Sequence, residues 1–181
     1  MPVDDVQLVP YDAHWPEIFR IEAERLRQLL GTAMVLRIEH VGSTAVPGLT
    51  AKPIIDMLIE IPSFASAQGN ILPKLLEERW EYHWRDDRPP GHMMFIRRNA
   101  AGVRTHHVHM APAGHSMWER LAFRDYLRCR PEEARHYEQL KIRLASDHSA
   151  DRQAYTEGKG EYVKRITAKA LSTLSSEADN S

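Results

Sequence analysis

Residues 39–61 read EHVGSTAVPGLTAKPIIDMLIEI, and this stretch decides the fold. Apolar runs rich in β-branched residues on each side of a loop predict two strands, over residues 34–41 and 54–61. The loop between them, residues 42–53, holds two glycines and two prolines, which interrupt regular structure. Asp56, 13 residues after Ser43, places a charge inside the second apolar run.

Gly42 and Ser43 follow the first predicted strand directly. A glycine lets backbone N–H groups approach a phosphate closely, and the serine hydroxyl adds a further donor. Lys52 lies at the far end of the loop, where its cation can meet the same phosphate. We therefore interpret Gly42, Ser43 and Lys52 as candidate substrate-binding residues. The loop matches neither the P-loop nor the dinucleotide pattern, and a turn that simply needs a glycine also explains it.

Asp56 carries a stronger signal, because an unpaired charge is costly to bury. Its carboxylate must be solvated, paired with a cation or loop amides, or bound to a metal. Alternation along a strand places Asp56, Leu58 and Glu60 on one face. Two-metal phosphoryl transfer needs two or three converging carboxylates, and Leu58 stands where the second would be most useful. This strand therefore predicts one metal-binding carboxylate.

Residues 93–98 and 103–110 predict a hairpin with a glycine in its turn. Because Val108 and Met110 look like core, His107 and His109 are expected on the opposite face. Two histidines spaced in this way can ligate one divalent metal or flank a phosphate. We therefore predict Asp56, His107 and His109 as catalytic residues and as ligands of Mg²⁺, Mn²⁺ or Zn²⁺.

Alternatives to this metal site stay open. His40, two residues before Gly42, is a candidate further ligand, and a purely structural role explains any of these histidines. The hairpin also resembles the HxHxH run of histidine-triad hydrolases, but the next alternating position is Ala111. Arg104 on the hairpin and Lys159 near the C-terminus are candidate substrate-binding cations. A simpler interpretation of Arg104 is a charged residue on a solvated strand edge. A simpler interpretation of Lys159 is a helix position that happens to lie between two glycines.

The rest of the chain predicts mostly helix. Asp12 is expected to cap a helix that Gly31 ends. Residues 80–92 suggest a loop or irregular strand. Further helices are expected from Ser63, with a break at Pro73, and over residues 116–129, 131–147 and 151–174. The predicted fold class is α+β or mixed α/β, with one sheet flanked by helices and a helical C-terminal third. We expect one domain over residues 1–176 and a frayed tail over 177–181.

Composition narrows the function. Twenty-four basic and 25 acidic residues give a formal net charge of -1, which argues against a nucleic-acid-coating protein. The single cysteine, Cys129, excludes an internal disulfide and a thiolate zinc motif. No apolar run approaches the length of a membrane span, so we predict a cytoplasmic protein that does not bind a membrane. Its predicted partner is a small nucleotide or phosphate compound. The pattern predicts no particular oligomeric state.

Five segments in order resemble the GrpB family along almost the whole chain: LVPYDAHWPEIF, EHVGSTAVPGLTAKPIIDM, RTHHVHM, LAFRDYLR and YTEGKGEYV. The family is similar to the nucleotidyltransferase superfamily related to DNA polymerase beta. This resemblance implies a mixed sheet flanked by helices, with the superfamily's Gly-Ser turn and strand acid on Gly42, Ser43 and Asp56. The chain departs from the superfamily at two positions. Leu58 stands where the superfamily has its second metal-binding acid, and the region of His107 and His109 stands where it has the third.

Three functions follow as hypotheses. The first is nucleotidyl or phosphoryl transfer with one metal, and the second is a nucleotide-binding module that has lost this activity. The third is a phosphoester hydrolase that depends on histidine or metal. Whether the chain is an enzyme stays open at this point.

Overall fold

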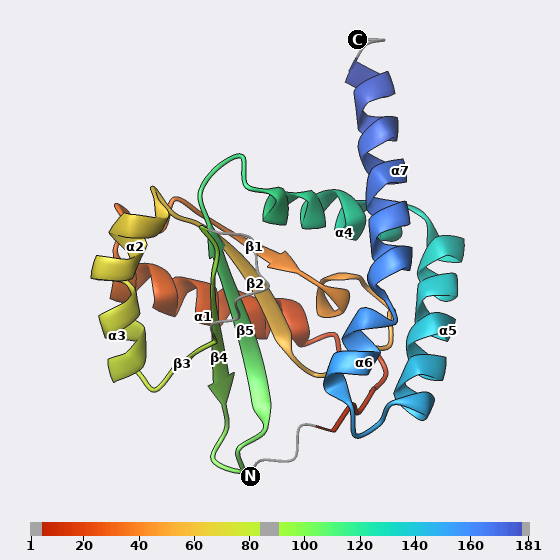
Figure 1. Ribbon diagram of the computed structural model, residues 1–181, viewed down its shortest axis with the longest axis horizontal. Coiled ribbons are helices and arrows are strands. Elements are labelled where there is room, and N and C mark those ends of the chain that lie inside the picture. Colours follow the sequence, from red (N-terminus) through yellow and green to blue (C-terminus); the bar gives the residue numbers. More distant parts are fainter. Residues whose placement is uncertain (1–4, 84–90, 179–181) are drawn as a thin grey trace.

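The computed structural model describes residues 5–83 and 91–178. Within these residues one sheet forms, with the strand order β1-β2-β5-β4-β3. Its strands are β1 (Arg37–Val41), β2 (Ile55–Glu60), β3 (Glu81–Tyr82), β4 (Met93–Arg98) and β5 (Arg104–Ala111). β2 and β5 are parallel, and the other neighbouring pairs are antiparallel. The predicted mixed sheet flanked by helices is confirmed (Figure 1).

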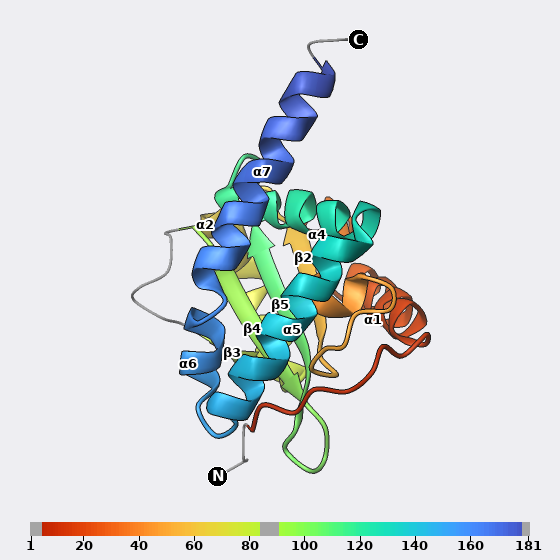
Figure 2. The same ribbon diagram turned by 90° about the vertical axis from the view of Figure 1, so that its right-hand side faces the viewer.

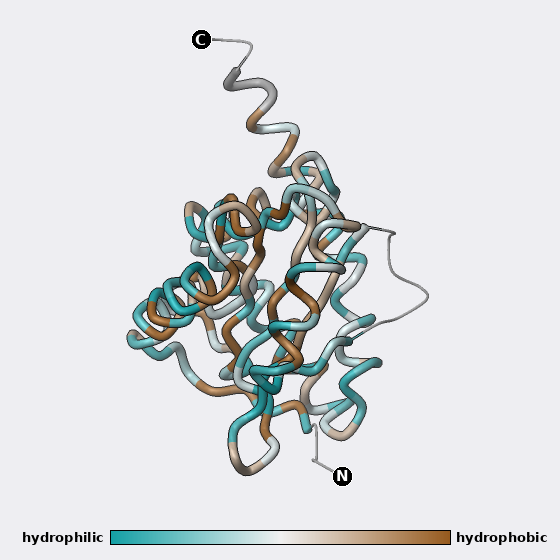
Figure 3. The backbone as a smooth tube through the Cα atoms, turned by 90° about the vertical axis from the view of Figure 1, so that its left-hand side faces the viewer, coloured by the Kyte–Doolittle hydropathy of each residue, from teal (hydrophilic) through white to brown (hydrophobic). Residues whose placement is uncertain are grey.

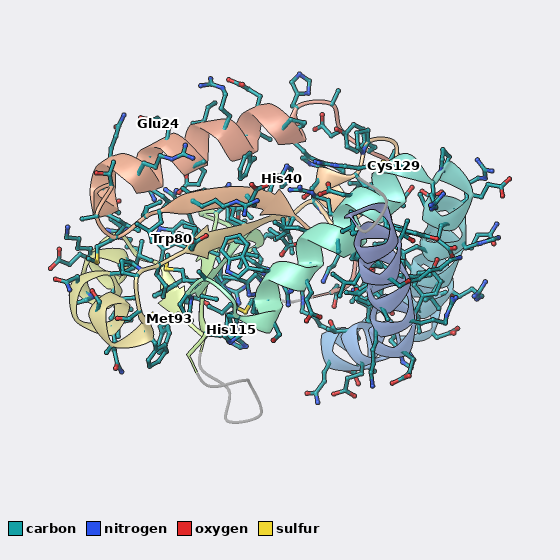
Figure 4. All side chains as sticks on the ribbon, turned by 90° about the horizontal axis from the view of Figure 1, so that it is seen from above. Glu24, His40, Trp80, Met93, His115 and Cys129 are labelled. Atoms are coloured by element: carbon teal, nitrogen blue, oxygen red, sulfur yellow. The ribbon has the colours of Figure 1, made fainter. Side chains whose placement is uncertain are left out.

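Helices cover both faces of the sheet. The helical elements are α1 (Trp15–Leu30), η1 (Ser43–Ala45), α2 (Phe64–Asn70), α3 (Leu72–Glu77), η2 (Ser116–Glu119), α4 (Arg120–Cys129), α5 (Pro131–Asp147), α6 (Arg152–Glu157) and α7 (Gly160–Ala178). Seen from above, α1 and α4 lie on opposite sides of the sheet (Figure 4). Helices α5, α6 and α7 stand together beside it, and the end of α7 projects from the body (Figures 1 and 2). No helix in the described ranges combines the length and the apolar character that a membrane crossing needs.

The main core lies between the sheet and helices α1 to α3, where Met57 of β2 and Val108 of β5 are buried. Leu58 points to the other face and is fully buried in a small cluster, which includes Val41, Ala111 and Met117. A third cluster joins Val46 and Leu49 to α4, α5 and α7. The tube in Figure 3 shows hydrophobic segments in the middle of the molecule and many hydrophilic turns on its outside. Because its two faces meet different layers, β2 can hold a polar side chain opposite the main core.

Two predicted boundaries near the N-terminus are wrong. The strand expected over residues 34–41 begins only at Arg37, because the N–H groups of Met34 and Val35 both donate to the Gly31 carbonyl. Asp12 does not cap α1, which begins at Trp15. Its carboxylate instead accepts the His14 N–H, at 2.9 Å. The end of α1 at Gly31 is confirmed, with a φ of 84° that suits glycine.

The helix expected over residues 151–174 is interrupted, and α6 ends before Gly158. The backbone of Gly158 lies so close to α5 that a Cβ there would be 2.6 Å from Leu144 Cδ2. Helix α7 then continues to Ala178, which makes the start of the predicted tail helical. Residues 179–181 of that tail, and residues 84–90 of the predicted loop over 80–92, lie outside the described residues.

The remaining helix and hairpin predictions agree with the structure. The Ser63 hydroxyl caps α2 by accepting the Ser66 N–H, at 3.1 Å. Pro73 lies at the start of α3, so the chain breaks between α2 and α3 as expected. Strands β4 and β5 form the predicted hairpin, and α5 has the predicted bounds.

Candidate anion-binding site

Asp56 and His107 face each other across the parallel strands β2 and β5. They are partners in the strand register, and His107 Nδ1 lies 3.0 Å from Asp56 Oδ1. The His107 ring is nearly buried, whereas 28% of the Asp56 side chain remains exposed. The fold thus brings together two of the three residues predicted as catalytic.

The surroundings of this pair decide its protonation. Burial raises the pKa of the Asp56 carboxyl, but its hydrogen bond with His107 and nearby positive charges outweigh burial and keep that pKa below its usual value. Burial lowers the pKa of His107, although the bond to Asp56 opposes this. At neutral pH we therefore expect an ionised carboxylate and a neutral imidazole. Since a carboxylate only accepts hydrogen bonds, His107 Nδ1 donates the proton and Nε2 is left as an acceptor. Nε2 is buried and has no hydrogen-bond partner among the described residues.

Gly42 packs its backbone directly against Asp56. Its φ is 73°, and a Cβ at this position would lie only 2.5 Å from Asp56 Oδ2. Two separate constraints, backbone conformation and space, thus require glycine here. Gly42 had been interpreted as a residue that lets the backbone approach a phosphate. The group it approaches in this structure is the Asp56 carboxylate.

Ser43 connects the loop to the helical layer. Its hydroxyl makes a hydrogen bond with Tyr137 of α5, which opposes the rise that burial causes in the pKa of Tyr137, to about 12. Tyr137 also interacts electrostatically with Asp56, so this side chain from α5 lies close to the strand carboxylate. The predicted loop serine is therefore near Asp56, together with a tyrosine that the sequence had not singled out.

Two lysines meet at the buried ring of Tyr155, which is 1% exposed. The Lys52 ammonium lies 5.1 Å from the centre of that ring, and the Lys159 ammonium lies 4.2 Å from it. The pKa of Lys52 is lowered to about 7, mainly by burial and in smaller part by the charge of Lys159. Burial also lowers the pKa of Lys159 to about 8, while the Asp56 carboxylate opposes this. The predicted cations Lys52 and Lys159, 107 residues apart in sequence, are thus neighbours.

Three arginines complete the positive region. Arg120, the first residue of α4, interacts electrostatically with the Asp56 carboxylate. The charge of Arg152 of α6 lowers the pKa values of both Lys52 and Lys159. Arg104 of β5 is one of the predicted substrate-binding cations, and its charge lowers the pKa values of Lys52 and His107. Within the described residues, Lys52, Arg120 and Lys159 therefore act on the Asp56 carboxylate, while Arg104 and Arg152 act on the neighbouring lysines and on His107.

His109 lies on the same face of β5 but belongs to a different cluster. Its Nδ1 is 3.1 Å from His92 Nε2, the two rings stack, and the ring of His115 lies nearby. Its partner in the strand register is Leu58, which fills the position with apolar packing. In residues 5–83 and 91–178 no three His, Cys, Asp or Glu side chains are arranged to hold a metal ion. Asp56, His107 and His109 therefore do not fit a shared metal.

His40 is not a further member of the site. It lies on the side of the sheet that faces α1 (Figure 4), where its ring stacks on Phe19 with the centres 4.7 Å apart. Its Nε2 is 3.0 Å from the Thr44 hydroxyl. Burial lowers the pKa of His40 to about 4. The alternation of β1 explains the error, because His40 shares a face with Ile38 of the main core.

Helices α4 and α5 hold the loop that carries Lys52. Glu138 Oε1 accepts the Thr50 N–H at 2.8 Å, and the Lys141 ammonium donates to the Thr50 carbonyl. Arg128 Nε donates to the Ala45 carbonyl at 2.8 Å. Both ends of the loop are thus attached to the C-terminal helices. Sequence reasoning missed five residues on α4, α5 and α6, because periodicity does not show which turn of a helix meets the sheet: Arg120, Tyr137, Lys141, Arg152 and Tyr155.

A family model described as GrpB protein matches residues 5–169. The chain belongs to the GrpB family. A UPF0157 protein of Pseudomonas aeruginosa is 43% identical over 170 residues, which are 93% of this chain and 69% of the relative. The crystal structure of the conserved protein GrpB from Enterococcus faecalis superposes with a TM-score of 0.81 at 34% identity, over 93% of this chain and 99% of that one.

A more distant likeness is to the Cid1 poly(U) polymerase, with a TM-score of 0.49 and 11% identity over 77% of this chain and 41% of that one. This value is too low to establish a shared fold. Membership of the GrpB family is therefore confirmed, and the nucleotidyltransferase relationship implied by the resemblance stays a prediction.

Proposed function

We propose that this GrpB protein binds the phosphate groups of a nucleotide or a related compound at the Asp56 face of its sheet. The observation that carries this is the grouping of three cationic side chains, Lys52, Arg120 and Lys159, around the Asp56 carboxylate, with both lysine ammoniums beside the Tyr155 ring. Like charges held close together in a partly desolvated region repel one another. An anion placed between them removes that repulsion, which favours a multiply charged ligand such as a phosphate ester or anhydride.

The residues divide this work by position. Lys52 and Lys159 stand beside the Tyr155 ring, so they would contact one phosphate group from two sides. Arg120 enters from the start of α4 and can offer the paired N–H groups that suit phosphate oxygens. The nucleotide part of the proposal rests on the resemblance to nucleotidyltransferases and on no contact in the structure.

Two observations favour a binding module over a transferase. Leu58 occupies the position where a second strand carboxylate would stand, and it is packed among apolar residues. The Nε2 atom of His107 is buried, so solvent does not reach the atom that would act as a base. We therefore propose binding as the main function.

The hydrolase or transferase alternative has one observation in its favour, which is the hydrogen bond that orients His107. Nε2 would accept a proton from a water molecule or a hydroxyl group while the oxygen of that group forms a bond to phosphorus. The bond from phosphorus to the leaving phosphate would break, and the lysines would neutralise the leaving group's charge. Asp56 would hold the imidazole in the required tautomer.

Calorimetric titration with nucleoside triphosphates, the matching nucleosides and inorganic pyrophosphate tests the proposal. We expect heat of binding from the phosphate compounds and none from the nucleosides. Lys52→Met and Lys159→Met should each weaken binding, whereas Lys164→Met on the exposed side of α7 should not. Equal binding by all three variants and wild type would remove the proposal. Phosphate release that stops in His107→Gln while binding persists would favour the hydrolase.

A further inference from the structure

The donor atoms around Asp56 do not suit a divalent cation. One carboxylate oxygen, Oδ1, is engaged by His107 Nδ1. The position two residues along β2 is the apolar Leu58, and His109 is engaged by His92. A magnesium or manganese site needs several oxygen ligands in fixed geometry. At the position of Asp56, Oδ2 is thus the one carboxylate oxygen that His107 does not engage.

Positive charge, which a metal would bring to a phosphate site, is already supplied by side chains. Lys52, Lys159 and Arg120 each interact electrostatically with the Asp56 carboxylate. They come from three separate segments, the loop, the α6–α7 connection and α4, and both lysine ammoniums lie beside the Tyr155 ring. A divalent cation brought into this group would face repulsion from all of them. Metals and these cations are therefore alternative ways to neutralise the same ligand.

We infer that this site binds its phosphate ligand without a divalent metal, with lysine and arginine side chains in the place of the metal. This inference rests on the proposed phosphate binding and specifies how it works. It also reverses the role of Asp56. In a metal-bridged site the carboxylate attracts the ligand through the metal, whereas here it opposes the ligand and keeps the cations together until the ligand binds.

The depressed pKa values of Lys52 and Lys159, about 7 and about 8, agree with this arrangement. An anion beside these amines favours their charged forms and raises their pKa. Binding near pH 8 should therefore take protons up from the buffer. Ligation by a metal ion would have the opposite tendency, because a cation beside a lysine favours the neutral amine.

The test is calorimetric titration of the full chain with inorganic pyrophosphate, once with EDTA and once with excess Mg²⁺. We expect binding in EDTA, and affinity reduced or unchanged in Mg²⁺, because Mg²⁺ binds free pyrophosphate. Pyrophosphate binding in Mg²⁺ but none in EDTA would overturn the metal-free inference and leave the proposed function standing. Absence of binding in both conditions would remove the proposed function itself.

Asp56→Asn gives a second test with opposite signs. A metal-bridged site loses its ligand when this carboxylate is neutralised. The metal-free site should bind pyrophosphate more tightly, by about tenfold or less for one partly screened charge. Lys159→Met should weaken binding in EDTA, with Lys164→Met as the matched control. Circular dichroism establishes that each variant is folded, and a folded Asp56→Asn protein with weaker binding would contradict the inference.

Discussion

A Cβ atom on residue 42 would lie 2.5 Å from Oδ2 of Asp56, so the loop glycine and the strand carboxylate are in direct contact. This contact explains why the Gly-Ser turn and the aspartate belong to one unit, although 14 positions separate them. The turn allows the backbone to close over the carboxylate. Any side chain at residue 42 would push Asp56 away from His107.

Gly42→Ala should therefore destabilise the protein for two reasons. Alanine at a φ of 73° costs about 1 kcal/mol in the backbone, and the contact with Asp56 adds about 1–3 kcal/mol of strain. Urea unfolding measures the total. Gly48→Ala is a matched control, because Gly48 has a φ of 78° with nothing within 4 Å of its Cβ. Equal losses in the two variants would show that the contact with Asp56 costs nothing.

The stability of the ligand-free protein should rise as pH increases from about 7 to about 9. Burial lowers the pKa of Lys141 to about 7, from an ordinary value of 10.5. Within this window the unfolded chain binds more protons than the folded one, so stability increases with pH. The limit for one lysine is about 1.4 kcal/mol per pH unit.

Lys141→Met should reduce that slope, because this position no longer titrates, although Lys52 and Lys159 with pKa values of about 7 and about 8 still contribute. Chemical unfolding at several pH values measures the slope for wild type and variant. Lys164→Met, which changes an exposed lysine, should leave the slope unchanged. Parallel curves for wild type and Lys141→Met would show that Lys141 does not titrate in this range.

Much of the fold and part of the site followed from alternation along the strands. The spacing of Val108 and Met110 placed His107 on the face opposite the core, and in the structure it lies there beside Asp56 of the neighbouring strand. The apolar run around Asp56 correctly indicated a charge that needs partners. These successes share a cause: on a strand, side-chain direction follows directly from sequence position.

The remaining features depend on contacts between distant segments. His109 is bonded to His92, 17 residues earlier, and the predicted spacing of metal ligands contained no information about that partner. Lys159 reaches the site because the chain turns between α6 and α7, which helical periodicity alone had predicted as one helix. Arg120 and Tyr155 were missed since a helix surface has several directions and packing selects one.

Glu138 should control Lys52 through the loop between them. Glu138→Ala removes the acceptor of the Thr50 N–H, which should cost about 1–2 kcal/mol of stability. Because Thr50 lies two residues before Lys52, the affinity for pyrophosphate should fall as well. Urea unfolding and calorimetry measure the two effects.

Glu138→Gln keeps an acceptor oxygen and should restore most of both losses. The control is Glu132→Ala, which changes a side chain that is 86% exposed on the same helix. If Glu138→Gln restores stability but leaves pyrophosphate affinity as low as in Glu138→Ala, the carboxylate charge matters more than the position of the loop.

Gly158→Ala should displace Lys159, because the new Cβ would lie 2.6 Å from Leu144 Cδ2 and 3.2 Å from the Ala154 carbonyl oxygen. The backbone of Gly158 is helical, with φ of -59° and ψ of -20°. Alanine at such a position, if space allows, stabilises a protein by about 0.4–1 kcal/mol. A loss of stability would therefore measure the contact with α5. Gly160→Ala is the control, since nothing lies within 4 Å of its Cβ.

The double variant Gly158→Ala/Leu144→Ala separates contact from conformation. Leu144→Ala removes the atoms that meet the new Cβ, so the two substitutions should be less harmful together than the sum of their separate effects. The expected coupling is about 1 kcal/mol by urea unfolding, and the affinity for pyrophosphate should recover in parallel if Lys159 returns to the Tyr155 ring. Additive losses would show instead that Gly158 is needed for the turn between α6 and α7, independently of its packing against α5.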